Sequence, residues 1–254
     1  MSKLILNHVN KSFGGVHAVN DFSLEAQGDG IVSIIGPNGA GKTTIFNLIS
    51  GIYPLDSGTM YLDDQEFTGK EQYQIALMGI ARTFQNIRLF KGLNCLENVM
   101  TALDSRSKTN LLDVAFLSKR KAREEKEGRE RAMEELKWVG LEKVAREKPE
   151  NLSYGHQRRL EIARALVQKP KILLLDEPAA GLNPKEVKEL TELIREVKEQ
   201  RNLTILLIEH HIDMVMELSE RIYVQNFGET IFVGTPREVQ QDPKVISAYL
   251  GEEA

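Results

Sequence analysis

The sequence has little of what membrane spans, secreted proteins and disulfide-linked domains require. It contains one cysteine, Cys95, in 254 residues, which excludes a disulfide framework and a cysteine zinc cluster and fits a reducing compartment. No apolar run reaches the length of a membrane span, because KILLLDE and LTILLIEHH both end after a few apolar residues. The opening segment, MSKLILNHVNKSF, lacks the apolar centre of a signal peptide. We therefore expect a cytosolic protein that reaches a membrane only through a partner.

The sequence also has no excess of basic over acidic residues. The formal net charge is −4 and the isoelectric point is about 5.8, so charge gives no reason to expect nucleic acid as the main partner. The rest of the composition is ordinary, with 41% hydrophobic and 28% charged residues, as in soluble proteins with an apolar core. The length fits one large domain, or a domain with a sub-domain.

Three short apolar runs predict buried strands. They cover residues 31–36, 171–176 and 203–209 and are apolar almost throughout, as strands covered on both faces are. Apolar residues at helical spacing occupy 43–50, after the first run, and 184–200, between the other two. This alternation of strands and helices indicates an α/β core with a mainly parallel sheet.

Two regions differ from this core. Residues 3–26 and 59–64 partly alternate in polarity, which predicts antiparallel strands. Residues from about 86 to 150 are mostly helical in pattern, which indicates a helical sub-domain inserted between core strands. Its segment SKRKAREEKEGRERAMEELK is rich in both charge signs, and we interpret it as a solvated helix face. Capping residues predict helix starts at Asn183, Thr235 and Asp242.

The segment GPNGAGKTT lies between a predicted strand and a predicted helix. It fits the pattern G-x-x-x-x-G-K-[ST], in which glycines let successive N–H groups surround a phosphate and the helix N-terminus favours negative charge. Lys42 would meet the β- and γ-phosphates, and the Thr43 hydroxyl would bind Mg²⁺. The alternative, a chance glycine-rich turn, is disfavoured by the strand–loop–helix context. The sequence therefore predicts a nucleoside triphosphate site at Gly36, Pro37, Asn38, Gly39, Ala40, Gly41, Lys42, Thr43 and Thr44.

Acidic and histidine side chains end the other two apolar runs. Asp176 and Glu177 follow ILLL at the edge where α/β sheets bind ligands. Asp176 would contact Mg²⁺ through water or from the second shell, and Glu177 would orient or deprotonate the attacking water. His210 or His211 could hydrogen-bond the γ-phosphate, but their side chains diverge on a strand, which disfavours a two-histidine metal site. The alternatives are solvated acids and a surface histidine at strand ends.

In this order, the phosphate loop, a glutamine, a Leu-Ser-x-Gly loop, the Asp-Glu strand end and the histidine resemble the ATP-binding cassette ATPases over nearly the whole chain. By this resemblance, Gln85 contacts Mg²⁺ at the joint with the helical sub-domain, and His210 is the switch histidine. The segment LSYGH matches the signature loop, in which Ser153 and Gly155 face the γ-phosphate of an opposite subunit. Phe13 matches the aromatic residue that stacks on adenine, with a core phenylalanine as the alternative.

The resemblance also implies the fold and the partners. It implies one ABC ATPase domain over 1–254, with an α/β P-loop NTPase core of mainly parallel sheet and an N-terminal antiparallel β sub-domain. The core would cover 1–85 and 168–254, and an inserted helical sub-domain would cover 86–167. Two cassettes would meet head to tail with ATP and Mg²⁺ between them, so we expect a second copy or a paralogue. Transmembrane permease subunits would hold the pair at the inner face of the cell membrane.

Short segments narrow the resemblance further. LSYGHQRRLEIARAL, LLLDEPAAGLNP and a tail ending near AYLG resemble the ATPases of branched-chain amino acid importers. Cassettes that drive lipid or lipopolysaccharide export are an alternative. Soluble cassette ATPases of DNA repair or translation, and a nucleotide-binding regulator without turnover, are others. A groove near Gln85 would receive a helix of the membrane subunit, with a lining that otherwise would be core: Phe84, Ile87, Leu89 and Phe90.

Four positions depart from the general cassette pattern: Tyr154, His156, Asn183 and His211. Asn183 caps a helix as well as aspartate does, although a contact across the dimer that needs a carboxylate there is put in doubt. The set associated with hydrolysis is complete, namely Lys42, Gln85, Ser153, Gly155, Asp176, Glu177 and His210. We therefore expect an active ATPase.

Overall fold

The computed structural model describes residues 2–28, 30–106 and 119–250. The chain divides into two compact units: unit 1 contains 1–85 and 171–254, and unit 2 contains 86–170. The second unit thus ends three residues beyond the sequence estimate of 167. Ser118, which opens the charged segment, and Gly251, which ends the tail AYLG, lie outside the described residues.

The larger sheet of unit 1 has six strands in the order β10-β9-β3-β8-β7-β6. Every neighbouring pair is parallel except β9 with β10. The strands are β3 (Ile31–Ile35), β6 (Ile80–Arg82), β7 (Ile172–Asp176), β8 (Thr204–Ile208), β9 (Arg221–Asn226) and β10 (Glu229–Gly234). All residues of β3, β7 and β8 are buried, so the three predicted apolar strands and the mainly parallel α/β fold are confirmed.

The smaller sheet of unit 1 is antiparallel, in the order β2-β1-β4-β5. Its strands are β1 (Lys3–Phe13), β2 (Val16–Gln27), β4 (Ser57–Leu62) and β5 (Gln65–Glu66). Gly14 and Gly15, both at positive φ, form the turn between β1 and β2. The antiparallel region predicted near the N-terminus is confirmed.

Unit 1 also contains several helices, three of which have starts that capping residues predict. The helices are α1 (Lys42–Ile49), α2 (Gln72–Met78), α7 (Pro184–Arg201), α8 (Ile212–Leu218), α9 (Pro236–Gln241) and α10 (Pro243–Leu250). Asn183 and Thr235 form capping boxes at α7 and α9, and the Asp242 carboxylate accepts from the first N–H groups of α10. The three predicted helix starts are confirmed.

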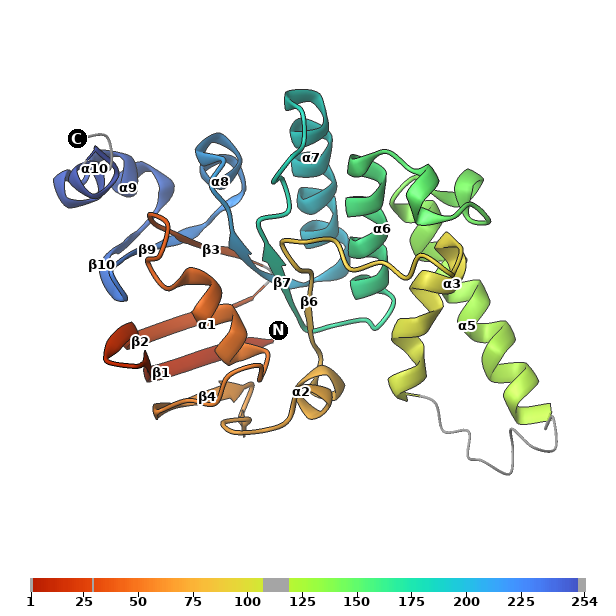
Figure 1. Ribbon diagram of the computed structural model, residues 1–254, viewed down its shortest axis with the longest axis horizontal. Coiled ribbons are helices and arrows are strands. Elements are labelled where there is room, and N and C mark those ends of the chain that lie inside the picture. The colour runs from red at the N-terminus through yellow and green to blue at the C-terminus, as the bar shows by residue number, and fades with distance from the viewer. Residues whose placement is uncertain (1, 29, 107–118, 251–254) are drawn as a thin grey trace. The chain divides into compact units, whose positions relative to one another are not determined.

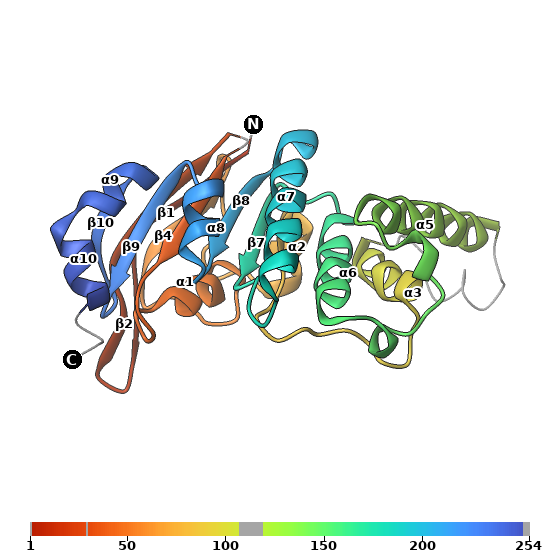
Figure 2. The same ribbon diagram turned by 90° about the horizontal axis from the view of Figure 1, so that it is seen from above.

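The two faces of the six-stranded sheet carry different layers. One apolar core joins this sheet to α1, α2 and the smaller sheet, through residues such as Phe22, Phe46 and Phe67. A second core, around Val215 and Val239, joins β3 and β9 to α8, α9 and α10. Figure 1 shows α1 and α8 on opposite sides of the sheet, and Figure 2 shows α9 and α10 beside β10.

Unit 2 is helical in the residues that the structure describes. It contains α3 (Cys95–Met100), α5 (Lys119–Trp138), α6 (Tyr154–Leu166) and the 3₁₀ helices η1 (Thr101–Arg106), η2 (Glu142–Val144) and η3 (Pro149–Asn151). Its core includes Val99, Leu136 and Ile162, from three helices. Exposed ion pairs four residues apart, such as Arg123 with Glu127, occupy α5, as expected for a solvated face. Throughout 2–28, 30–106 and 119–250, we find no helix with the length and apolar character to cross a membrane.

Candidate active site

The phosphate loop, residues 36–44, follows β3 directly and includes the first turn of α1. Gly36, Gly39 and Gly41 have φ of 149°, 80° and 96°, which residues with a Cβ rarely adopt. A Cβ at Gly36 would lie 2.1 Å from the Gln225 carbonyl oxygen, and one at Gly41 would lie 2.1 Å from the Ala18 carbonyl oxygen. Backbone packing as well as dihedral angle therefore requires glycine at both positions.

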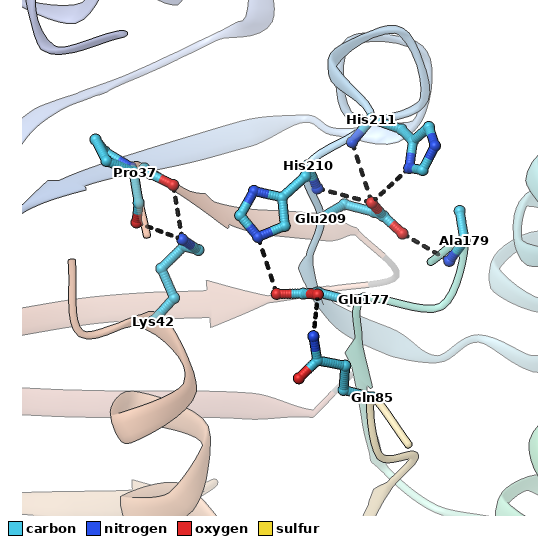
Figure 3. A network of polar contacts seen from close by, with 9 residues as sticks. Pro37, Lys42, Gln85, Glu177, Ala179, Glu209, His210 and His211 are labelled. Carbon is cyan, nitrogen blue, oxygen red and sulfur yellow. Dashed lines mark hydrogen bonds and ion pairs between the residues drawn. The ribbon is translucent and has the colours of Figure 1, made fainter. Parts of the chain in front are cut away.

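The residues of the loop differ in how far they are exposed to solvent. Pro37, Ala40 and Lys42 are buried, Thr44 is half-buried, and Asn38, Gly39 and Thr43 are exposed. The Lys42 ammonium donates to the carbonyl oxygens of Gly36 at 2.6 Å and Pro37 at 2.7 Å, as Figure 3 shows. The Lys42 ammonium therefore lies against the phosphate loop, where it would contact an anion bound there.

Asp176 ends β7 and lies in a buried ion pair. Its Oδ2 accepts from Nη2 of Arg82 at 2.7 Å, and both side chains are almost fully buried. Nη1 of Arg82 donates to Asn47 Oδ1 and Ser50 Oγ, both at 2.8 Å, and so connects β6 and β7 to α1. Sequence reasoning missed Arg82, although it lies three positions before Gln85 in the segment ARTFQ.

The structure brings Gln85, Glu177 and His210 together. Nε2 of Gln85 donates to Glu177 Oε2 at 2.6 Å, and Nε2 of His210 lies 2.9 Å from Glu177 Oε1. Glu177 adopts φ 47°, an uncommon angle for a residue with a Cβ, and its N–H donates to the carbonyl of Ile208 at 2.8 Å. Two predicted site residues, Gln85 and His210, therefore converge from separate segments on the carboxylate of a third, Glu177.

Glu209 is a buried carboxylate that sequence reasoning missed. Its Oε1 accepts from the Ala179 N–H at 2.6 Å, and its Oε2 accepts from the N–H groups of His210 at 2.7 Å and His211 at 3.1 Å. Nδ1 of His211 lies 3.0 Å from the same Oε2. His210 and His211 thus turn toward different glutamates (Figure 3), as expected for neighbouring residues at a strand end.

Phe13 lies at the end of β1 with 42% of its surface exposed, which argues against a core phenylalanine. Its ring packs edge-on against Tyr53, with 5.1 Å between ring centroids. Nζ of Lys11 lies 5.4 Å from the centre of the Phe13 ring. An exposed ring at this place can stack on a flat ligand. Sequence reasoning did not include Tyr53.

In unit 2, Ser153 is the N-cap of α6 and its Oγ accepts from the His156 N–H at 3.3 Å. Gly155 is buried in the first turn, while Tyr154 is 42% exposed. The Tyr154 ring centroid is 5.9 Å from the guanidinium carbon of Arg158, which forms a buried ion pair with Glu161 at 2.8 Å. Within its own unit, the loop is an ordinary helix start with a small hydroxyl at the cap. Of the expected groove lining, Phe90 is exposed, whereas Ile87 and Leu89 are half-buried.

The three predicted Mg²⁺ contacts offer suitable chemistry. Thr43, Gln85 and Asp176 supply a hydroxyl, an amide and a carboxylate oxygen, and Mg²⁺ prefers oxygen ligands. No cluster of three or more His, Cys, Asp or Glu able to hold a metal occurs within the described part of the chain. The donor set therefore fits an ion that takes most of its other ligands from phosphates and water, not a self-contained metal site.

Comparison with known families places these features in a wider group. A family model described as ABC transporter matches residues 19–180, and one described as branched-chain amino acid ATP-binding cassette transporter matches 229–254. The chain is 49% identical over 249 residues to the high-affinity branched-chain amino acid transport ATP-binding protein LivG of Escherichia coli K12, covering 98% of both chains. It is 34% identical over 253 residues to the lipopolysaccharide export system ATP-binding protein LptB of the same strain, covering 100% of this chain and 99% of LptB.

Solved structures give the same result. The ADP conformation of MJ1267, an ATP-binding cassette of an ABC transporter, has a TM-score of 0.85 and 31% identity, covering 99% of each chain. A dimeric structure of the ATP-binding cassette MJ0796 bound to ADP and Pi has a TM-score of 0.77 and 29% identity, covering 92% of this chain and 99% of MJ0796.

Proposed function

The chain belongs to the ABC transporter family of ATP-binding proteins, which are ATPases, and on that premise we propose that its Mg²⁺-dependent ATP hydrolysis powers the import of branched-chain amino acids. The convergence of Gln85 and His210 on the Glu177 carboxylate supports the hydrolytic part. The 49% identity to LivG, over nearly all of both chains, supports the substrate class.

ATP binds first at the phosphate loop. The N–H groups at the start of α1 and the positive end of the helix attract the β-phosphate. The Lys42 ammonium, held against the loop by two carbonyls, exchanges these neutral acceptors for charged phosphate oxygens, which form stronger hydrogen bonds. Phe13 provides the exposed ring for the adenine.

Thr43, Gln85 and Asp176 are the residues that would hold Mg²⁺. When bound, the ion neutralises charge on the β- and γ-phosphate oxygens. The Arg82 guanidinium fixes the Asp176 carboxylate in place, because it also binds Asn47 of α1 and Ser50, the C-cap of the same helix. Lys42, which receives the phosphates, begins α1, and Asp176, which faces the ion, is tied to the same helix through Arg82.

Glu177 then acts on the attacking water. Its carboxylate orients the water and accepts a proton from it. Nε2 of His210 lies within hydrogen-bond distance of the same carboxylate. When ATP is bound, this nitrogen would turn from Glu177 to donate to the γ-phosphate, beside the base. Phosphoryl transfer depends mostly on such positioning and on stabilisation of charge.

The second half of the site comes from another cassette, either a second copy or a paralogue. Ser153 and Gly155 of that subunit meet the γ-phosphate, as a cap hydroxyl and a helix N-terminus do for anions. ATP closes the pair and hydrolysis reopens it. Transmembrane permease subunits convert this cycle into transport and hold the pair at the inner face of the membrane.

The test of catalysis is Glu177→Gln in the purified chain with its permease partner. We expect kcat to fall by about 10²-fold or more, with ATP affinity unchanged, because glutamine keeps the shape and loses the base. Glu196→Gln, at an exposed position of α7, is the matched control and should behave as wild type. If Glu177→Gln hydrolysed ATP as fast as the wild type, Glu177 would not be the general base. If the wild-type protein itself showed only background ATPase activity, a regulator without turnover would be favoured.

The substrate class needs a separate test, because lipopolysaccharide export is the second candidate and LptB is a full-length relative. The chain would be reconstituted with the membrane subunits of its transporter, and uptake of radiolabelled leucine, isoleucine and valine measured. We expect ATP-dependent uptake that Glu177→Gln abolishes. Release of lipid or lipopolysaccharide without amino acid uptake would instead establish the export alternative.

A further inference from the structure

Glu209 is placed where two segments of the proposed active site meet. One segment follows Glu177 and includes Ala179, and the other follows β8 and includes His210. Each oxygen of the Glu209 carboxylate accepts from one of these segments. Oε1 accepts from the Ala179 N–H, and Oε2 accepts from the N–H groups of His210 and His211.

The burial of this carboxylate requires an explanation. Glu209 is only 2% exposed, and a buried carboxylate is unfavourable unless it is paired or hydrogen-bonded. Backbone N–H groups from both segments satisfy it, and hydrogen bonds to a charged acceptor are short and strong.

The surroundings of Glu177 show what the carboxylate holds together. The Glu177 N–H donates to Ile208, the residue before Glu209, while the Glu177 side chain contacts His210, the residue after it. Glu209 closes this arrangement on the other side through Ala179. Two hydrogen bonds therefore flank the contact between Glu177 and His210. One joins the backbones of Glu177 and Ile208, and the other joins the Ala179 N–H to the Glu209 carboxylate.

We propose that Glu209 is a positioning residue for ATP hydrolysis, which fixes His210 against Glu177 by holding the His210 backbone to the loop that follows Glu177. The inference rests on the proposed roles of Glu177 and His210. Because Glu209 acts through His210, its loss affects the hydrolytic step and leaves nucleotide binding at the phosphate loop intact.

The first experiment is Glu209→Gln in the full chain, assayed with the permease partner. Glutamine keeps the length but turns an NH₂ group toward N–H donors, so one of the two connections is lost. We expect kcat to fall about tenfold, in line with displaced catalytic groups, while the KM for ATP and the affinity for ADP stay within about twofold. Glu196→Gln removes the same charge at an exposed position of unit 1 and should leave all three values unchanged.

A double-mutant cycle with His210→Ala separates positioning from general stabilisation. If Glu209 acts through His210, Glu209→Gln should change the rate by less than about twofold once His210 is gone. Single-turnover assays with excess protein keep the slow variants measurable. An equal tenfold loss in both backgrounds, or a Glu209→Gln kcat at the wild-type value, would overturn the proposal.

Glu209→Asp is the second variant. It keeps the charge but is one methylene shorter, so it cannot reach both groups of donors, and we expect it to lower kcat at constant KM as well. If neither variant folds, Glu209 serves stability alone and the proposal is wrong. The proposed function fails by a different result, namely Glu177→Gln turning over ATP at the wild-type rate, so the two failures are distinguishable.

Discussion

At the residue scale, the phosphate loop offers a sharp test of backbone packing. Alanine at Gly36 or Gly41 would place a Cβ 2.1 Å from a carbonyl oxygen, whereas Gly39 at φ 80° has no atom within 4 Å of its Cβ position. We expect Gly36→Ala and Gly41→Ala to lower the free energy of unfolding by on the order of 3 kcal/mol and to abolish ATP binding. Gly39→Ala should lower it by about 1 kcal/mol, from strain alone.

Chemical denaturation and nucleotide titration of the three variants would measure these effects. Gly39→Ala is the control because it introduces the same methyl group in the same loop without the clash. Equal losses of stability in all three variants would mean that the dihedral angles, and not the close backbone contacts, decide the requirement for glycine.

Cys95 is predicted to be chemically inert in the folded protein. Burial, and secondarily the charge of Glu147, raise the pKa of its thiol to about 11, so at pH 8 only about one thiol in a thousand is the reactive thiolate. We expect no labelling by iodoacetamide at pH 8 in the native state and rapid labelling in 6 M guanidinium, measured by mass spectrometry. Cys95→Ala gives the blank, and rapid native labelling would show that the thiol is accessible.

At the element scale, Asn183 is predicted to stabilise α7 without needing a negative charge. Its Oδ1 accepts from the Glu186 N–H at 3.0 Å, and Glu186 accepts in return from the Asn183 N–H at 3.1 Å. Asn183→Ala should cost about 1 kcal/mol, a fall in Tm of about 2–4 °C for a chain of this size. Asn183→Asp keeps the cap and should melt near wild type. An alanine variant as stable as wild type would show that the cap contributes nothing.

The elements that could be predicted from sequence are those with a continuous apolar run or a clear capping signal. Strands β3, β7 and β8 are apolar because both faces of the sheet are covered, and α7 begins at a capping residue followed by proline. The strands β6, β9 and β10 were missed. β6 has three residues and β10 is mostly half-buried, so neither has a continuous apolar run or a clear alternation.

The same limit applies to the site. The phosphate loop and the strand-end residues follow from local spacing, because one short segment carries the whole pattern. Arg82, Glu209 and Tyr53 did not stand out, since their importance comes from partners that the fold supplies. Arg82 is 94 positions from Asp176 and Glu209 is 30 positions from Ala179. No spacing in one sequence specifies pairs of this kind.

At the scale of the whole molecule, the two candidate phosphate-binding elements lie in different units: Lys42 in unit 1 and Ser153 in unit 2. If ATP lies between the Lys42 loop of one subunit and the Ser153 loop of another, damage to either element can be placed on separate chains. We predict complementation between two inactive variants, Lys42→Ala and Ser153→Arg. The first keeps an intact Ser153 loop and the second an intact Lys42 loop, and each should bring the ATPase rate close to background when assayed alone.

In an equimolar mixture, half of the dimers combine the two variants, and each of these has one undamaged composite site out of two. Because the two sites of a symmetric pair are equivalent, the mixture should recover about a quarter of the wild-type ATPase rate, and the rate should rise with the square of protein concentration where dimers are scarce. Adding Glu177→Gln to the Ser153→Arg chain places the damaged base in the only intact site and should remove the recovery. Adding it to the Lys42→Ala chain should not. If the recovered rate were the same whichever chain carried Glu177→Gln, the site would not be shared between subunits. If no mixture recovered activity, the second half of the site would come from a paralogue.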